Sequence, residues 1–371
     1  MALMVTSDLL NTIAKMGLAT LRESIQLVKR TNREYEKDIT AATPGSTVNV
    51  VVPAPITAVT VTPGGVHPND TAAITPTVVP ITLDQWYRAA FAFSDKQKKQ
   101  VELGIIPMQI DEAIRGLVNK IEVHTWLNYK KFFGYSGTAG TTPFATDISA
   151  FLTAEKLAND QLMPGDRRAL IMDTAANANW KGLRRTFDRN FMDIGVEPVW
   201  TQHVPTHTTA ATHYQVNDDG NALAVGDKTV AIETDGSVSG YARIGDIITF
   251  AGDTQTYVVT AVTGGTGTTS SINIYPGLKL DPGTHAAITF KSSHVCNLLF
   301  HPNAIAFAMA PMQAGAGQYG VPAQEATAVD QASGLALRVT FFRQFYQDEW
   351  SFDALWGSAV PRPELGVRIS G

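Results

Sequence analysis

The segment from Ile39 to Leu83 carries a single formal charge, Asp70, in forty-five residues, and threonine, valine and proline fill twenty-six of its positions. Runs such as Val48–Val52 and Ile56–Val61 are rich in β-branched residues, which favour extended strands. Seven prolines interrupt the segment and remove backbone donors, so most of it cannot form a central strand. We therefore predict a long, projecting, hairpin-like arm.

An uncharged apolar arm left in water would template aggregation. We therefore expect another copy of the chain, or a partner, to cover it. The candidate contact residues are the larger apolar side chains of the segment: Val48, Val50, Val52, Ile56, Val59, Val61, Ile74 and Val78.

The composition narrows the classes of function. Charged residues make up 17% of the 371 positions, against roughly 25% in an average domain. Interface cores are depleted in charge, so this deficit indicates surface used for protein contacts. The net charge of −5 gives no basic footprint for sequence-specific nucleic-acid binding. Cys296 is the only cysteine, which excludes an intrachain disulfide and a thiolate zinc cluster. No apolar window is long enough to span a membrane.

Hydrophobic periodicity predicts three elements before residue 135. Apolar residues at helical spacing indicate an amphipathic helix over 8–36. Alternation over 87–94 indicates a half-buried strand, followed by a short helix to about Leu103. Pro107 suits the first turn of a helix whose apolar stripe continues to about Lys131. That helix is too long for a local connector, and we interpret it as a spine.

The rest of the chain alternates between two kinds of pattern. An α/β stretch is predicted with helices near 148–161 and 175–188 and strands near 168–172 and 196–200. Short strands and turn signals fill 206–292 without a helical period, which predicts a small inserted all-β module. The α/β pattern then resumes with a strand over 297–300 and a helix opened by His301-Pro302. Two strands near 335–341 and 349–355 follow.

Candidate catalytic and binding motifs have simpler explanations. Gly315-Ala-Gly317-Gln-Tyr-Gly320 has dinucleotide-binding spacing, but no amphipathic helix or suitably placed acidic residue follows it. His203, His207 and His213 are interpreted as solvated loop histidines, because Pro205 prevents the helical spacing of zinc motifs. We interpret 264–269 as a hairpin turn and Lys96–Lys99 as the solvent-exposed face of a short helix. The sequence therefore predicts no enzyme, no cofactor and no metal site.

The order of parts resembles the HK97-fold major capsid proteins of tailed double-stranded DNA bacteriophages. The segment Leu355–Ile369 is similar to the last segment of such coat proteins. Gly245–Gly252 and Ser271–Pro276 resemble the inserted β-domain of coat proteins from some short-tailed temperate phages. Those relatives carry a charged loop that bridges capsomers, whereas Asp253 is the only charge between Gly252 and Ser271 here.

The resemblance implies an α+β HK97-like fold with an inserted β-domain. Its parts would be an N-terminal helical arm (1–38), an extended loop (39–85), a peripheral domain with the spine helix (86–134), an axial domain (135–205 and 293–332), the inserted β-domain (206–292) and peripheral C-terminal strands (333–371). The implied function is a structural coat protein that assembles through hexamers and pentamers into an icosahedral shell.

The resemblance also implies a setting and partners. The shell would enclose double-stranded DNA without sequence-specific contact, and would be assembled in the bacterial cytoplasm as a virion capsid. A scaffolding protein, a portal and a decoration protein are the implied partners. Three alternatives stay open: a cellular nanocompartment shell of the same fold, an oxidoreductase using the glycines at 315–320, and a phage adhesin or decoration protein built on the β-module.

Overall fold

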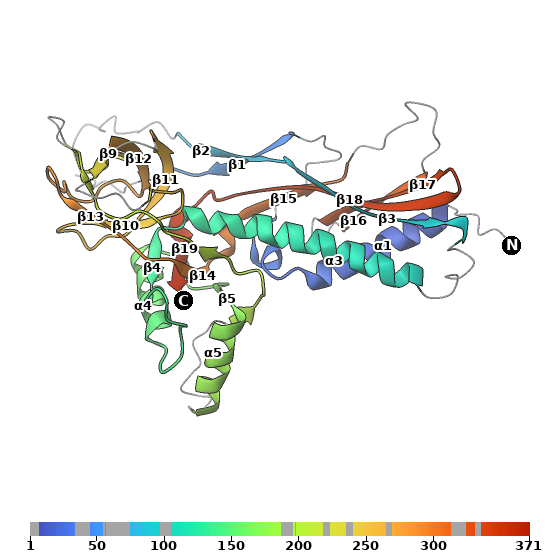
Figure 1. Cartoon of the computed structure of the whole chain (residues 1–371), viewed down its shortest axis with the longest axis horizontal. Coiled ribbons are helices and arrows are strands. Elements are labelled where there is room, and N and C mark those ends of the chain that lie inside the picture. The colour runs from blue at the N-terminus through green and yellow to red at the C-terminus, as the bar shows by residue number, and fades with distance from the viewer. Residues whose placement is uncertain are drawn as a thin grey trace, which may run out of the picture.

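The computed structural model describes residues 7–33, 45–54, 56, 75–96, 105–186, 196, 198–217, 223–234, 240–264, 269–312, 324–330 and 335–371. They form an elongated α+β molecule with a long sheet and two helices at one end (Figure 1). A closed barrel and a second sheet lie at the other end. The α+β class predicted from the sequence is confirmed.

The elongated end is built on a five-stranded sheet of order β15-β18-β17-β16, with β3 also paired to β18. Alternating apolar residues along the long strands give this sheet two distinct faces. The strands are β3 (Gln85–Ser94), β15 (Ala306–Ala310), β16 (Gln324–Asp330), β17 (Leu335–Gln344) and β18 (Gln347–Ala359).

Two helices cover one face of this sheet, α1 (Ser7–Ser24) and α3 (Ile105–Trp126) (Figure 1). Their apolar stripes bury Leu10, Ile114 and Ile121 against the sheet. Gly17 allows close contact, because a Cβ there would lie 3.0 Å from side-chain carbons of both Ile114 and Leu337. A 3-10 turn, η1 (Val28–Arg30), follows α1, and η3 (Leu127–Lys131) continues α3.

A two-stranded hairpin of β1 (Thr47–Val52) and β2 (Thr77–Thr82) lies on the opposite face of the sheet (Figure 1). It packs on β15 and β18 through its own apolar cluster. Gly357 in β18 permits this contact, because a Cβ there would collide with the carbonyl oxygen of Thr82. The hairpin is therefore anchored to the body of the molecule.

The second sheet has the order β4-β19-β14-β5-β6, with β7 also paired to β14. Helices α4 (Ser149–Asp160) and α5 (Thr174–Thr186) belong to this end of the molecule, where α4 packs on β4 and β19 and α5 on β6. The strands are β4 (Gly134–Ser136), β5 (Ala169–Met172), β6 (Pro198–Trp200), β7 (Thr206–His207), β14 (His294–Phe300) and β19 (Gly366–Ser370).

The barrel is a closed antiparallel ring of order β10-β11-β12-β9-β8-β13. The chain leaves the second sheet at His207 and returns at His294, and these two residues are paired partners in β7 and β14. The barrel is thus an insertion between two adjacent strands. Its strands are β8 (Tyr214–Val216), β9 (Thr229–Thr234), β10 (Ile247–Phe250), β11 (Tyr257–Thr263), β12 (Thr269–Tyr275) and β13 (Ala287–Phe290).

Most of the predicted elements are found near their predicted positions, and the differences lie at ends and crossovers. The helix predicted over 8–36 ends at Ser24, and residues 34–36 lie outside the described residues. The short helix predicted to reach Leu103 has Asp95 and Lys96 in helical conformation, and 97–103 lie outside the described residues. The helix predicted at His301-Pro302 is a single 3-10 turn, η4 (Pro302–Ala304), because β15 begins two residues later.

Two predicted domain boundaries need correction. Residues 293–332 were assigned to the axial domain, but β15 and β16 lie in the five-stranded sheet. Residues 333–371 were assigned to the peripheral strands, but β19 lies between β4 and β14 in the second sheet. The chain crosses between the sheets after Phe300 and again after Ala359. Strand pattern does not encode which sheet a strand joins, so the sequence could not show these crossings.

The excised segment 206–292 is expected to fold by itself. The buried cluster of the barrel, from Ala211 to Ile288, is contributed entirely by residues within that segment. Both of its ends also lie side by side in the intact chain, an arrangement typical of inserted domains. The amide NMR spectrum of the fragment should be dispersed. A random-coil spectrum would show that the predicted boundary at 206–292 is wrong.

Candidate assembly surface

The described part of the uncharged segment has one buried face and one exposed face. On the inner face, Val50 is 1% exposed and Ile81 is 0% exposed. Both pack against alanines of β15 and against Leu355. On the outer face, Val51 and Val78 are directly opposite each other across the two strands. Their side chains are 57% and 50% exposed, so they form an apolar pair facing solvent.

The candidate contact residues divide between these faces. Val78 and Ile56 are exposed, at 50% and 78%, as a contact residue must be. The prediction that Val50 contacts a neighbouring subunit is wrong, because its side chain is buried within its own chain. Val48 also packs against that inner cluster, and Val52 is half-buried. Val59, Val61 and Ile74 lie outside the described residues. Their assignment, and that of Val78 and Ile56, stays a prediction.

Sequence reasoning missed Val51, which lies on the exposed face. The run Thr47-Val-Asn-Val-Val-Val52 ends in three consecutive valines, so both alternating sets of positions are apolar there. Because strand side chains alternate between faces, such a run does not reveal which set is inward. The cross-strand pairing of Val51 with Val78 supplies that information.

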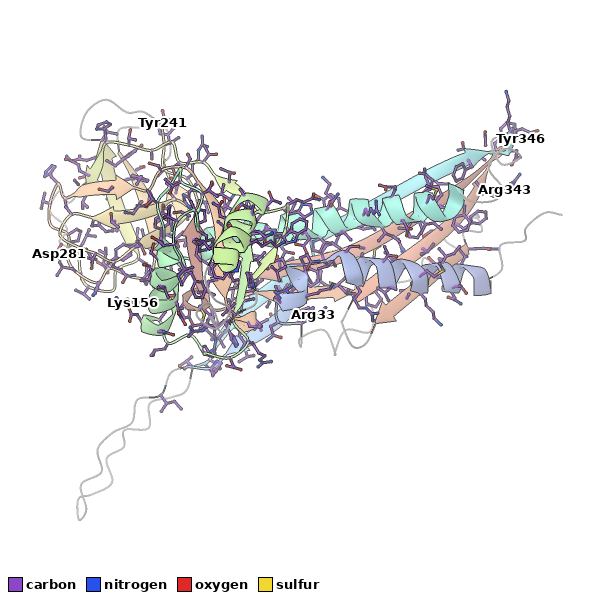
Figure 2. All side chains as sticks on the ribbon, turned by 90° about the horizontal axis from the view of Figure 1, so that it is seen from below. Arg33, Lys156, Tyr241, Asp281, Arg343 and Tyr346 are labelled. Atoms are coloured by element: carbon purple, nitrogen blue, oxygen red, sulfur yellow. The ribbon has the colours of Figure 1, made fainter. Side chains whose placement is uncertain are left out.

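A second exposed apolar feature lies at the far tip of the five-stranded sheet (Figure 2). The two-residue turn between β17 and β18 consists of Phe345 and Tyr346, which are 87% and 65% exposed. Tyr346 has a φ of 57°, a left-handed conformation that tight turns usually give to glycine or asparagine. Two adjacent aromatic residues between two predicted strands were the feature of the sequence that could have indicated this exposed tip.

Ion pairs hold this aromatic tip in place. Arg343 donates to Asp348 at 2.6 Å and to Asp95 at 2.9 Å, and these two carboxylates raise the pKa of the Arg343 guanidinium. The backbone N–H of Asp95 also donates to the carbonyl oxygen of Tyr346 at 2.9 Å. The turn is therefore tied to β3 and presents its aromatic rings to solvent on an ordered base.

A buried polar cluster joins the barrel to the rest of the molecule. His207 is 3% exposed, and its Nε2 lies 2.8 Å from Oδ1 of Asp246. Its Nδ1 lies 2.9 Å from the hydroxyl of Tyr129 in η3. Arg368 of β19 is 0% exposed and donates to the carbonyl oxygen of Gly245 at 2.8 Å, with its guanidinium 5.1 Å from the Tyr129 ring centre.

This cluster corrects the prediction that the histidines of this region are solvated. His207 is buried, although His213 is exposed and His203 is half-buried. The side-chain partners of His207, Tyr129 and Asp246, come from two distant parts of the chain, so no local pattern could reveal its burial. Burial raises the pKa of Tyr129 to about 12 and lowers the pKa of His294 to about 4. Both groups are therefore neutral at pH 7, and the cluster has the character of a structural joint.

The other candidate motifs give no catalytic constellation in the described part of the chain. The glycines at 315–320 lie outside it, and the next described element, β16, is a strand. The strands on either side of 264–269, β11 and β12, pair antiparallel as a hairpin requires, and 265–268 lie outside the described residues. Among the described residues no group of histidine, cysteine or acidic side chains has the arrangement of a metal site. No described helix is long and apolar enough to cross a membrane.

Comparisons with known proteins gave matches only among solved structures. No protein-family model and no curated protein matches the chain. The chain is similar to a structure from Mycobacterium phage Che8, with a TM-score of 0.47, 13% identity, and coverage of 93% of this chain and 90% of that one. A second is the capsid of the cyanophage P-SCSP1u, with a TM-score of 0.47, 9% identity, and coverage of 93% and 91%.

A third similar structure is a virus-like particle from Pyrococcus furiosus, with a TM-score of 0.43, 9% identity, and coverage of 96% of this chain and 97% of that chain.

Proposed function

We propose that this chain is the structural subunit of a closed icosahedral shell, built from hexamers and pentamers of the chain and enclosing double-stranded DNA. The observation that carries the proposal is the hairpin of β1 and β2. Its inner face is anchored to the chain's own sheet, while its outer face presents Val51 and Val78 to solvent. The segment 53–76, which joins the two strands in the sequence, has Asp70 as its only formal charge.

Physical reasoning connects this surface to self-assembly. Burying apolar area contributes about 25 cal/mol per Å² before the cost of association is subtracted. One small contact is therefore weak, and a shell gains stability by repeating it many times. The aromatic tip at Phe345 and Tyr346 adds a second apolar contact at the opposite end of the sheet (Figure 2). Widely separated contacts of this kind suit an extended lattice of identical subunits.

The charge of the chain supports enclosed DNA without tight binding. A net charge of −5 is too acidic for a lining that grips phosphates. DNA would therefore be contained without sequence-specific contact. Assembly in the bacterial host cytoplasm, with a scaffolding protein, a portal and a decoration protein as partners, forms part of this proposal through the resemblance to phage coat proteins.

A cellular nanocompartment shell is the second candidate, because the same apolar contacts would serve a shell around protein cargo. The contents of particles isolated from the cells that produce them distinguish the two. We expect DNA that resists nuclease until the particles are opened with denaturant. Particles that contain a co-purifying enzyme and no protected DNA would favour the nanocompartment and contradict the proposed contents.

A further inference from the structure

The turn that ends the N-terminal helical region is held by a side chain from the spine helix. Glu122 of α3 is 1% exposed. Its Oε1 accepts hydrogen bonds from the backbone N–H groups of Gln26 at 2.7 Å and Leu27 at 2.9 Å. Its Oε2 lies 3.2 Å from the nitrogen of Leu27. One buried carboxyl group thus binds the backbone just ahead of η1.

This arrangement fixes the entry to η1, which has no side-chain cap of its own. The first N–H groups of a helical turn have no partner within the turn and are normally satisfied by a nearby side chain. Leu27 occupies the N-cap position of η1 and provides no side-chain hydrogen bond. Glu122 instead holds the backbone N–H of this N-cap residue, from 95 positions along the sequence, and that of Gln26 before it. The turn therefore depends on its contact with the spine helix.

The two short hydrogen bonds converge on a single oxygen. A neutral carboxylic acid can accept both of them through its carbonyl oxygen, Oε1, and keep Oε2 as the hydroxyl. Only the 3.2 Å contact at Oε2 would then be weakened. The closed turn is therefore compatible with an uncharged Glu122.

The surroundings favour that uncharged form. Burial raises the pKa of Glu122 to about 7, against opposing effects from the backbone N–H groups of residues 26–28 and from the charge of Arg30. Arg30, on η1, is the charged side chain of the described residues that acts on Glu122, and its Nη1 donates to the carbonyl oxygen of Gln26 at 3.0 Å. Its single positive charge does not offset the desolvation of the carboxylate.

We propose that Glu122 is a pH-sensitive clamp, which holds the turn at residues 25–31 closed on the spine helix more firmly as a neutral acid than when it is ionised. The opening is local, because both sides of the turn are fixed. Leu10 and Leu21 of α1 are buried in the sheet core before it. After it, Asn32 exchanges backbone hydrogen bonds with Ile305 and Phe307 beside β15. The inference concerns a contact within one chain and does not depend on shell assembly.

The direction of the pH effect follows from linkage. In the open turn Glu122 reaches water and its pKa returns towards the reference value of 4.5, whereas in the closed turn it is about 7. Closure is therefore most stable below about pH 5 and weakens as the pH rises to 7. From these two values the open population should rise on the order of 50-fold between pH 5 and pH 8.

Amide hydrogen exchange of the full chain tests this proposal. Protection at residues 26–28, corrected for the chemical exchange rate, should fall on the order of 50-fold from pH 5 to pH 8, while protection in α1 stays constant. Glu122→Gln, which is neutral at every pH, should give a flat profile. Glu112→Gln, at an exposed position of the same helix, is the matched control and should retain the wild-type slope.

Constant protection at residues 26–28 in the wild-type chain would overturn the clamp, as would a wild-type slope in Glu122→Gln. If Glu122→Gln does not fold, the exchange profiles of the wild type and of Glu112→Gln still test the clamp. A slope confined to residues 25–31 in both supports the clamp, and an equal slope in α1 contradicts it.

Discussion

Replacing Asp246 with alanine is expected to lower the free energy of unfolding by about 3–5 kcal/mol, because each buried donor left unsatisfied costs about 1–3 kcal/mol. Asp246 is 0% exposed and accepts hydrogen bonds from His207 and from the backbone N–H of Arg243. Its loss leaves both donors unsatisfied. It also removes a carboxylate whose charge acts on the buried guanidinium of Arg368. Chemical denaturation of the wild type and the variant measures the difference.

Two further variants separate charge from geometry. Asp246→Asn keeps the shape and an acceptor oxygen but removes the charge, and should cost less than the alanine variant. Asp160→Ala removes a carboxylate that is 59% exposed and paired with Lys156 on a helix surface, and should cost less than about 1 kcal/mol. If Asp246→Ala were as mild as Asp160→Ala, the junction cluster would not be a structural joint.

The double substitution Val51→Asp with Val78→Asp is expected to block assembly and leave the fold of the subunit nearly intact. Both side chains are at least half exposed in the single chain, so the subunit should lose only about 1 kcal/mol, mainly from two like charges placed opposite each other. In a covered interface the two carboxylates would be desolvated, at a cost of several kcal/mol per ion. Light scattering follows assembly, and circular dichroism follows folding.

The matched control is Val51→Thr with Val78→Thr, which preserves branching and strand propensity without adding charge. It should assemble, though more weakly than the wild type, because unpaired hydroxyls cost less to bury than charges. Normal assembly of the aspartate variant would show that the outer face of the hairpin is not a contact surface.

The sequence predicted elements best where one face of the element is buried. Leu335, Leu337 and Val339 alternate with polar or small residues and lie in β17. The stripe containing Ile114 and Ile121 lies in α3. In each case burial on one side imposes a period that can be read from the residues alone.

Features that depend on distant partners were not predictable. Local pattern does not show that His207 meets Tyr129 and Asp246, because these partners are separated from it by 78 and 39 positions. The sequence does not show that Val50 faces inward, because its neighbours Val51 and Val52 are also apolar and successive strand residues face opposite sides. The crossing of β19 to the second sheet is set by its pairing with β14. Glu122 reaches the backbone of Gln26 and Leu27 only when the helices are packed.

Sedimentation velocity of the purified full chain tests the central proposal most directly, since a shell subunit must associate. We expect hexamers and pentamers, or closed particles of megadalton mass, when the chain is placed under assembly conditions or produced with a scaffolding protein. A strictly monomeric species in every buffer, with and without such a partner, would contradict the proposal that this chain builds a shell.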